Sequence, residues 1–485
     1  MLFSRIKYLI LALSFIACFG HTSFAQPAGS DRQPAYDAAR IYKAMAKAQR
    51  GEPIVIGVIG GSITMGSAAS SVSKRWANLM TDWWKTKFPL SNVTLVNAGI
   101  GATGSGIGAH RVQADLLSKN PDFVVVEFSV NDAYDIVSSQ TMEGLMRQIL
   151  VAANHPGVMM LILKQQNGAS SLYYHKPVAL NYHIPYISYA EWIGPKIAQD
   201  VVSLASLYSD GLHPVDLGMK YISGFITEEL DSIYAHLPAD SLLPAIDANL
   251  PAAKFSDVFE NTYVYNNTSL VSIVNTGWEN SNTGWVSSTP NSKLDFEVFG
   301  NAISFLYTRH NTSNRGYVEI WVDDGAHQIF DAYWSATWGP ATIFALIADN
   351  LDSGKHIVHA NILSYHNYNS TGNYFEIKNI LTAGNITPDF TVGSTATKSD
   401  LVIKVLPSAI KSSLRVLYSV PQSSKVTISI VSFTGQYLAA IASRSVEAGI
   451  HSEQVDTHQL GLSRGMYLMV MKVNGKTVAS KFMVE

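Results

Sequence analysis

Apolar and polar residues follow three patterns along this chain. In residues 26–245, short apolar runs with few charges alternate with longer segments in which apolar positions recur every three or four residues. Such runs are typical of strands buried on both faces of a parallel sheet, and the segments between them are typical of amphipathic helices. The runs, each predicted to form a strand, are residues 54–60, 93–97, 123–129, 158–163 and 185–188.

This order of elements predicts an α/β fold for residues 26–245. Parallel strands joined by helices need right-handed crossovers, which place helices on both faces of the sheet. We therefore expect a three-layer α/β/α domain with a parallel sheet.

The second pattern follows a linker at about residues 243–253. In residues 255–385, apolar residues recur at every second position, and turn residues separate the runs. This spacing predicts a β-sandwich of the jelly-roll type. The clearest strand-like runs are residues 295–299, 302–307, 316–322, 355–360 and 374–377.

The third pattern covers residues 400–485, after a polar linker at 387–400. It repeats the two-residue alternation in several short runs, which predicts a second, smaller β-sandwich. The predicted fold class is therefore an α/β domain followed by two all-β sandwich domains.

The N-terminus has the features of a targeting segment. Arg5 and Lys7 precede an apolar run at residues 8–19, and small residues occupy 23–25, so residues 1–25 are predicted to be a secretory signal peptide. The single cysteine, Cys18, lies inside it, and the exported chain would then form no disulfide. Lipidation of Cys18 is an alternative, but Phe15 fits the sequence pattern of a lipoprotein signal poorly. No other stretch approaches the roughly 20 apolar residues of a membrane span.

The composition narrows the class of partner. Of 485 residues, 47% are hydrophobic and 15% are charged, which is enough apolar material for several cores. The net charge of −3 provides no basic field for nucleic acid. A small neutral or polymeric substrate fits this balance better.

Candidate catalytic residues follow the predicted strands. Ser62 comes just after the first strand, the glycine-rich residues 97–104 after the second, and Asn131 after the third. Asp210 and His213 lie in a Gly- and Pro-containing loop before the last helix. Because the carboxyl ends of parallel strands meet at one edge of a sheet, these residues are expected to converge.

Together these residues suit acyl transfer. A serine hydroxyl needs a base, for which His213 is the candidate, and Asp210 would hold the imidazole in the required tautomer. The Ser62 N–H, a backbone N–H in residues 99–102 and the Asn131 amide could stabilise an oxyanion. Taken singly, Asp210 could be a helix N-cap, His213 a loop histidine and Asn131 a turn former. Their joint occurrence at strand ends favours catalysis.

The four segments resemble the four blocks of the SGNH hydrolases, also called the GDSL esterase/lipase family, over about residues 50–230. The resemblance implies that Ser62 is the nucleophile, His213 the base and Asp210 its partner, with Asn131 and a second-block glycine in the oxyanion hole. The first block reads Gly-Gly-Ser-Ile instead of Gly-Asp-Ser-Leu, as in a subset of carbohydrate-active members. The second-block glycine aligns with Gly101, or Ala102 takes its place.

The predicted β-sandwich looks like the non-catalytic jelly-roll modules attached to some acetyl esterases. Its many aromatic residues could stack on sugar rings, or they could fill the core of a small sandwich. The tryptophans concerned are Trp278, Trp285, Trp321, Trp334 and Trp338.

Residues 400–485 resemble the C-terminal sorting domain of the type IX secretion system, carried by exported proteins of Bacteroidetes and their relatives. The matching features are residues 431–435, residues 460–465 before Met466-Tyr-Leu, and the closing Lys481-Phe-Met-Val. The resemblance implies a secreted or cell-surface protein that is handled by secretion machinery. A second binding module is the alternative.

The resulting hypothesis is a secreted serine esterase that removes acetyl groups from a polysaccharide through an acyl-enzyme, with no metal or organic cofactor. A lipase or lysophospholipase is the alternative within the enzyme class, and a non-catalytic surface glycan-binding protein is the alternative outside it. The loop at residues 165–177, with Tyr173, Tyr174 and His175, is expected to contribute to specificity.

Overall fold

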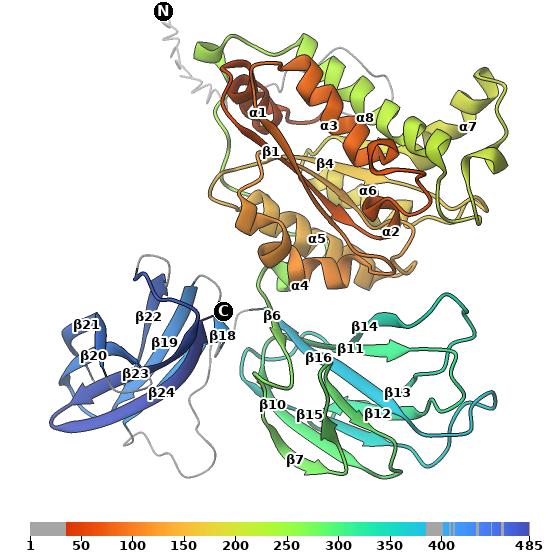
Figure 1. Cartoon of the computed structure of the whole chain (residues 1–485). Coiled ribbons are helices and arrows are strands. Elements are labelled where there is room, and N and C mark those ends of the chain that lie inside the picture. Colours follow the sequence, from red (N-terminus) through yellow and green to blue (C-terminus); the bar gives the residue numbers. More distant parts are fainter. Residues whose placement is uncertain are drawn as a thin grey trace, which may run out of the picture.

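The computed structural model describes residues 35–384, 401–406, 409–410, 413–432, 436–447, 449–456 and 460–484. Within them an α/β domain, a β-sandwich and a C-terminal β domain follow one another along the chain (Figure 1). The predicted signal peptide, with Cys18, and the linker 387–400 lie outside the described residues.

The α/β domain is built on a parallel sheet with strand order β2-β1-β3-β4-β5. Its strands are β1 (Ile54–Gly60), β2 (Val93–Gly99), β3 (Phe123–Glu127), β4 (Gly157–Ile162) and β5 (Tyr186–Ser188). Its helices are α1 (Ala39–Gln49), α2 (Ser62–Met65), α3 (Trp76–Lys87), α4 (Ser105–Asp115), α5 (Ile136–Leu150), α6 (Leu172–Asn181), α7 (Tyr189–Gln199) and α8 (Asp216–Ala235). The predicted α/β fold class is confirmed.

Side chains of the sheet pack alternately into two separate cores. On β3, Phe123 and Val125 join a core with α1, α3, α7 and α8, whereas Val124 and Val126 join a core with α4, α5 and α6. Because successive side chains of a strand point to opposite faces, a strand covered on both sides must be apolar throughout. This explains why these runs carry few charges, and it leaves most of the polar residues at the strand ends.

The β-sandwich stacks two antiparallel sheets around one core. One sheet has the order β13-β12-β15-β10-β7, and the other has the order β14-β11-β16-β9-β8, with β6 also paired to β16. The strands are β6 (Thr262–Tyr265), β7 (Ser272–Thr276), β8 (Glu279–Asn280), β9 (Trp285–Ser287), β10 (Lys293–Phe299), β11 (Ala302–Arg309), β12 (Tyr317–Val322), β13 (Gln328–Asp331), β14 (Ala341–Ala348), β15 (Lys355–Ile362) and β16 (Phe375–Ala383).

The fold buries some of the tryptophans that were candidates for sugar contact and exposes others. Trp278 and Trp285 are buried at 5% and 2% exposure and belong to the sandwich core, as the core-filling alternative requires. Trp338 is 60% exposed, and its ring lies edge-on to that of Trp334.

The outer face of the β14-β11-β16 sheet packs against α4 of the α/β domain, and we call this contact the docking face (Figure 1). Leu306 and Leu381 form a buried cluster there with Ile107 of α4. A Cβ added at Gly106 would lie 2.7 Å from the Phe344 ring, so α4 approaches β14 more closely than a larger residue would allow. The sheet is therefore apolar on both faces.

The chain between the two domains is held by polar side chains of α5. The buried carboxylate of Glu143 accepts hydrogen bonds from the backbone N–H groups of Lys254, Phe255 and Ser256 at 2.7, 2.6 and 2.9 Å. Arg147 forms an ion pair with Glu260 at 3.0 Å. Within the predicted linker, the carbonyls of Asp247, Pro251 and Ala252 accept hydrogen bonds from side chains of the α/β domain at 3.3, 3.0 and 3.1 Å. The linker thus lies on the α/β domain.

The C-terminal domain has two sheets of its own, β17-β19-β22 and β18-β24-β23-β20-β21, around a separate core. The strands are β17 (Val402–Leu406), β18 (Ala409–Ile410), β19 (Ser413–Val420), β20 (Ser424–Ser432), β21 (Tyr437–Val446), β22 (Gly449–Asp456), β23 (Gly465–Val473) and β24 (Lys476–Val484).

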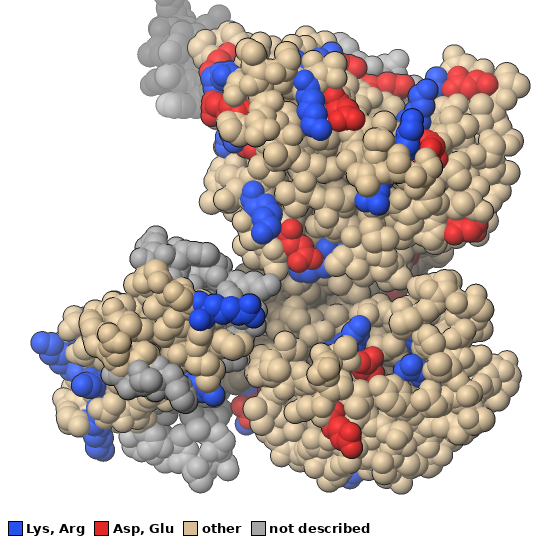
Figure 2. All heavy atoms as spheres, in the orientation of Figure 1, with Lys and Arg blue, Asp and Glu red and all other residues tan. Residues whose placement is uncertain are grey.

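The visible surface carries charges of both signs. On the face in Figure 2, cations and anions are interspersed over the α/β domain, and most of the β-sandwich surface is uncharged. None of the described helices has the length and apolar character needed to cross a bilayer.

The docking of the linker generates a stability prediction. Glu143→Gln keeps the shape of the side chain but replaces one acceptor oxygen by an NH₂ group, which faces backbone donors. Leaving a buried donor unsatisfied costs about 1–3 kcal/mol, so the variant should unfold at a lower urea concentration than the wild type. The exposed Glu279→Gln is the matched control and should leave the midpoint unchanged. Equal midpoints for Glu143→Gln and the control would show that these hydrogen bonds do not stabilise the chain.

Candidate active site

Ser62 lies where β1 ends and the short helix α2 begins. Gly60 and Gly61 form the connection, and Ser62 is the first helical residue, 7% exposed. A Cβ added at Gly60 would overlap the Thr64 hydroxyl and the Glu127 carbonyl, so only glycine fits this tight turn. The Ser62 N–H belongs to the first turn of the helix, where backbone donors have no intrahelical acceptor.

The loop before α8 brings a carboxylate and an imidazole to Ser62. Asp210 Oδ2 lies 2.7 Å from His213 Nδ1, and His213 Nε2 lies 2.8 Å from Ser62 Oγ. Asp210 Oδ1 accepts hydrogen bonds from the backbone N–H groups of Leu212 and His213, at 3.0 and 2.8 Å. Gly211 has a φ of +81°, which a residue with a side chain adopts only at a cost. The predicted Ser, His and Asp therefore lie in one hydrogen-bonded row.

The electrostatics of this row favour an ionised Asp210. Partial burial acts to raise the pKa of the Asp210 carboxyl, but the hydrogen bonds from His213 and Leu212 outweigh burial and hold the pKa below its ordinary value. The carboxylate can then accept the Nδ1–H of His213, which leaves Nε2 to face the serine hydroxyl.

Two further groups predicted from the sequence lie beside Ser62. A Cβ added at Gly101 would be 3.8 Å from Ser62 Cβ, so the second-block loop approaches the serine closely. A Cβ added at Gly61 would overlap Asn131 Oδ1, so the Asn131 side chain packs against the residue before Ser62. Ala102 has a φ of +57°, as part of the sharp turn that follows Gly101.

The segment predicted as a loop at 165–177 is a loop only as far as Ser171, because residues 172–177 form the first turns of α6. Its first part supports the Asp210 loop, because the Gln166 N–H donates to the Gly211 carbonyl at 2.8 Å. Its later part places Tyr173 at 84% exposure but buries His175 completely. The contribution of this segment to specificity stays a prediction. The buried His175 has no surface with which to contact a substrate.

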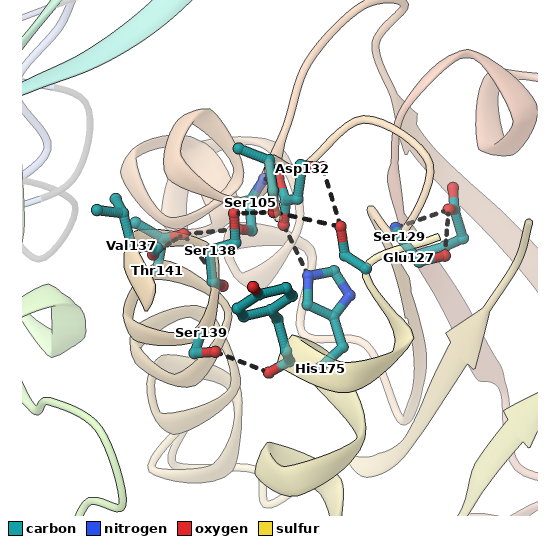
Figure 3. Close-up of polar contacts among 12 residues, drawn as sticks. Ser105, Glu127, Ser129, Asp132, Val137, Ser138, Ser139, Thr141 and His175 are labelled. Atoms are coloured by element: carbon teal, nitrogen blue, oxygen red, sulfur yellow. Dashed lines mark hydrogen bonds and ion pairs between the residues drawn. The ribbon is translucent and has the colours of Figure 1, made fainter. Parts of the chain in front are cut away.

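Glu127 is a buried acid near the site, and its role was not predicted from the sequence. Its carboxylate accepts hydrogen bonds from the Ser129 N–H at 3.1 Å and from the hydroxyls of Ser129 and Thr64 at 3.3 and 3.2 Å (Figure 3 shows the Ser129 contacts). Burial raises its pKa to about 7. A charged residue closing the otherwise apolar run of β3 was the available signal in the sequence.

No set of three or more His, Cys, Asp or Glu side chains in the described part of the chain is arranged to hold a metal ion. The groups gathered at Ser62 are a hydroxyl, an imidazole, a carboxylate and potential oxyanion donors. Such a set can carry out acyl transfer with protein groups alone.

Comparisons with family models agree with the fold. Residues 58–221 match the GDSL-like lipase/acylhydrolase family, and residues 404–485 match the secretion system C-terminal sorting domain. The chain therefore contains a hydrolase domain of the GDSL/SGNH type and a sorting domain of the type IX class, which indicates export.

Individual proteins resemble different lengths of the chain. The thioesterase 1/protease 1/lysophospholipase L1 of Escherichia coli (strain K12) is 28% identical over 191 residues, which are 37% of this chain and 84% of that protein. A two-domain esterase active on acetylated mannans, solved also with mannopentaose, is 28% identical with a TM-score of 0.64. That match covers 72% of this chain and 96% of the solved one.

The buried Glu127 predicts a particular dependence of stability on pH. Between its ordinary pKa of 4.5 and its folded pKa of about 7, the folded chain keeps a proton that the unfolded chain has released. Stability should therefore fall as pH rises through this range, by up to about 3 kcal/mol. Glu127→Gln cannot titrate and should lack this slope. Urea unfolding of both proteins at several pH values measures the difference, and parallel curves would contradict a raised pKa.

Proposed function

We propose that this protein is an esterase that removes acetyl groups from a polysaccharide through an acyl-enzyme formed on Ser62. The observation that carries the proposal is the 2.8 Å contact between Ser62 Oγ and His213 Nε2, backed by Asp210 at 2.7 Å. In this arrangement a proton can leave the hydroxyl as it attacks an ester.

The first half of the reaction is acylation. Ser62 Oγ attacks the carbonyl carbon of the ester while His213 Nε2 takes the hydroxyl proton, and Asp210 stabilises the imidazolium that forms. The oxyanion accepts hydrogen bonds from the Ser62 N–H, the Gly101 N–H and the Asn131 side-chain amide. When the tetrahedral intermediate collapses, the sugar hydroxyl leaves with the proton from His213.

The second half releases the acid. A water molecule gives a proton to His213 and attacks the acetyl carbon of the acyl-serine, and the same donors stabilise the second oxyanion. Collapse returns the proton to Ser62 Oγ and frees acetate. Each proton that His213 takes up is given back, so the imidazole is neutral again after every turnover.

The substrate class is supported by the extent of the match to the mannan-active esterase. The similarity includes the β-sandwich as well as the α/β domain, since it covers 72% of this chain. We therefore infer that the substrate is an acetylated polysaccharide, with mannan as the first candidate and xylan as the second. The exposed Trp338 would then be a candidate for sugar contact on the β-sandwich.

A lipolytic esterase is the second candidate, and the similarity to the Escherichia coli thioesterase/lysophospholipase favours it. That similarity is confined to 37% of the chain. The non-catalytic glycan-binding protein remains the alternative from another class. Export through the sorting domain to the cell surface or the medium is part of the proposal in each case.

The decisive test compares the wild type with Ser62→Ala on four esters: p-nitrophenyl acetate, p-nitrophenyl palmitate, acetylated mannan and acetylated xylan. We expect acetate release from the polysaccharides, a loss of at least about 10³-fold in kcat for Ser62→Ala, and no turnover of palmitate. The exposed Ser118→Ala is the matched control and should retain full activity.

Other outcomes select the alternatives. Preference for palmitate would favour the lipolytic esterase. An inactive wild type that still binds the polysaccharides would favour the glycan-binding protein.

A further inference from the structure

Asp132 directly follows Asn131, and its carboxylate joins separate segments of the α/β domain (Figure 3). Oδ1 accepts a hydrogen bond from the Ser105 N–H at the start of α4, at 2.6 Å, and Oδ2 lies 2.8 Å from His175 Nε2 on α6. The side chains of Asp132 and His175 are only 5% and 0% exposed. A carboxylate buried to this extent requires such donors, because an unpaired charge is costly away from water.

The space for this contact is built into the second-block loop. A Cβ added at Gly104 would overlap Asp132 Oδ1, so the carboxylate reaches the loop backbone only because this residue is glycine. The same loop carries Gly101, which lies beside Ser62. The Asp132 carboxylate therefore ties the second and third blocks to each other.

The backbone around Asn131 is also attached to α6 by Ser171. The Ser171 hydroxyl donates to the Asp132 carbonyl at 2.9 Å, and the Ser171 N–H donates to the Ser129 carbonyl at 2.7 Å. Contacts on both sides of Asn131 thus lead to the helix that carries His175.

Asn131 itself lacks an anchor on its carbonyl side. Its Oδ1 is turned towards Gly61, is buried, and has no hydrogen-bond partner among the described residues. Since Oδ1 and Nδ2 lie on opposite sides of the amide, Nδ2 is turned away from Gly61. The orientation of the amide must then come largely from the backbone that carries it, which the Asp132 contacts hold.

We propose that Asp132 and His175 form a positioning pair that holds the Asn131 amide in the oxyanion hole. The inference rests on the proposed function, because it assigns the pair to that reaction. Neither residue need touch the substrate, since His175 acts through Asp132 and Asp132 through the backbone of Asn131. A misplaced oxyanion donor weakens binding of the transition state more than binding of the substrate, so the effect falls on kcat and not on KM.

Substitutions of His175 separate positioning from plain stability. Because Nδ1 of His175 has no hydrogen-bond partner among the described residues, His175→Phe removes the Asp132 contact and no other ring hydrogen bond found there. His175→Gln retains a donor near the position of Nε2. Asp132→Asn replaces one of the two acceptor oxygens by an NH₂ group with almost no change in volume, so it can no longer accept both the Ser105 N–H and an Nε2–H of His175. The control is His356→Phe, which removes the contacts of the His356 ring with Asp323 Oδ2 and with the Asp352 carbonyl, at 2.7 and 2.8 Å, in the β-sandwich.

Rates on p-nitrophenyl acetate should show the following pattern. Asn131→Ala lowers kcat about 100-fold, and His175→Phe and Asp132→Asn lower it about 10-fold, each with KM within about two-fold. His175→Gln restores kcat to within about three-fold of the wild type, and His356→Phe leaves kcat unchanged. When His175→Phe is added to Asn131→Ala, kcat should fall by less than about a further two-fold, because the residue that His175 positions is absent.

A full 10-fold loss in the Asn131→Ala background would overturn the inference, and so would a lower melting temperature with unchanged kcat. If the wild type hydrolyses no ester, the proposed function fails, and a second readout decides on positioning alone. In protein labelled with ¹⁵N-asparagine, the side-chain signals of Asn131, assigned by their loss in Asn131→Ala, should shift or broaden in His175→Phe and not in His356→Phe. Unchanged signals would overturn the positioning role in either case.

Discussion

The parallel register of β1 with its two neighbours is the constraint on which the site depends. Gly60, the last residue of β1, pairs with Gly99 on β2 and with Glu127 on β3, so the three strands end at the same level. The segments that carry Ser62, Gly101 and Asn131 all start from this edge. A shift of one residue in either pairing would turn every side chain of a strand to the other face, and the two cores would not allow it.

Buried carboxylates then fix the loops that leave this edge. Glu127 binds the Thr64 hydroxyl in the helix that carries Ser62, and Asp132 binds the loop that carries Gly101. Glu143 does the same for the chain that leads to the β-sandwich. In each case one side chain holds backbone or hydroxyl donors that apolar packing alone would leave unsatisfied. The acids that organise the fold are therefore inside it, and the surface in Figure 2 remains mixed in charge.

The fold and the hydrogen-bonded row of Ser62, His213 and Asp210 could be predicted because both leave local marks in the sequence. Strands covered on both faces carry almost no charge. Two of the proposed catalytic residues, Ser62 and Asn131, lie shortly after such strands, and His213 lies in the loop before α8. The sequence did not reveal Asp132 and His175 as partners, because their contact joins positions 43 residues apart through the tertiary fold. The only local feature that pointed to Asp132 was its position next to Asn131.

The strand β14 and the burial of the tryptophans could not be predicted from the sequence, for a different reason. β14 reads Ala341-Thr-Ile-Phe-Ala-Leu-Ile-Ala348 without the alternation of a one-sided strand, and we did not predict it. Its outward Phe344 is covered by α4, so both of its faces are apolar, and such a short run fits helix or strand equally well. Whether Trp278 pointed to sugar or to the core depended on packing that no local pattern encodes.

The docking face also bears on how the chain is made. Synthesis from the N-terminus completes the α/β domain before the β-sandwich exists, so the Ile107 surface of α4 stays uncovered until β11 and β16 have formed. During that interval the nascent protein carries an apolar patch of the kind that chaperones bind. A gene fragment that stops after α8 would make this state permanent, so the natural unit for transplanting the proposed catalytic site extends through β16.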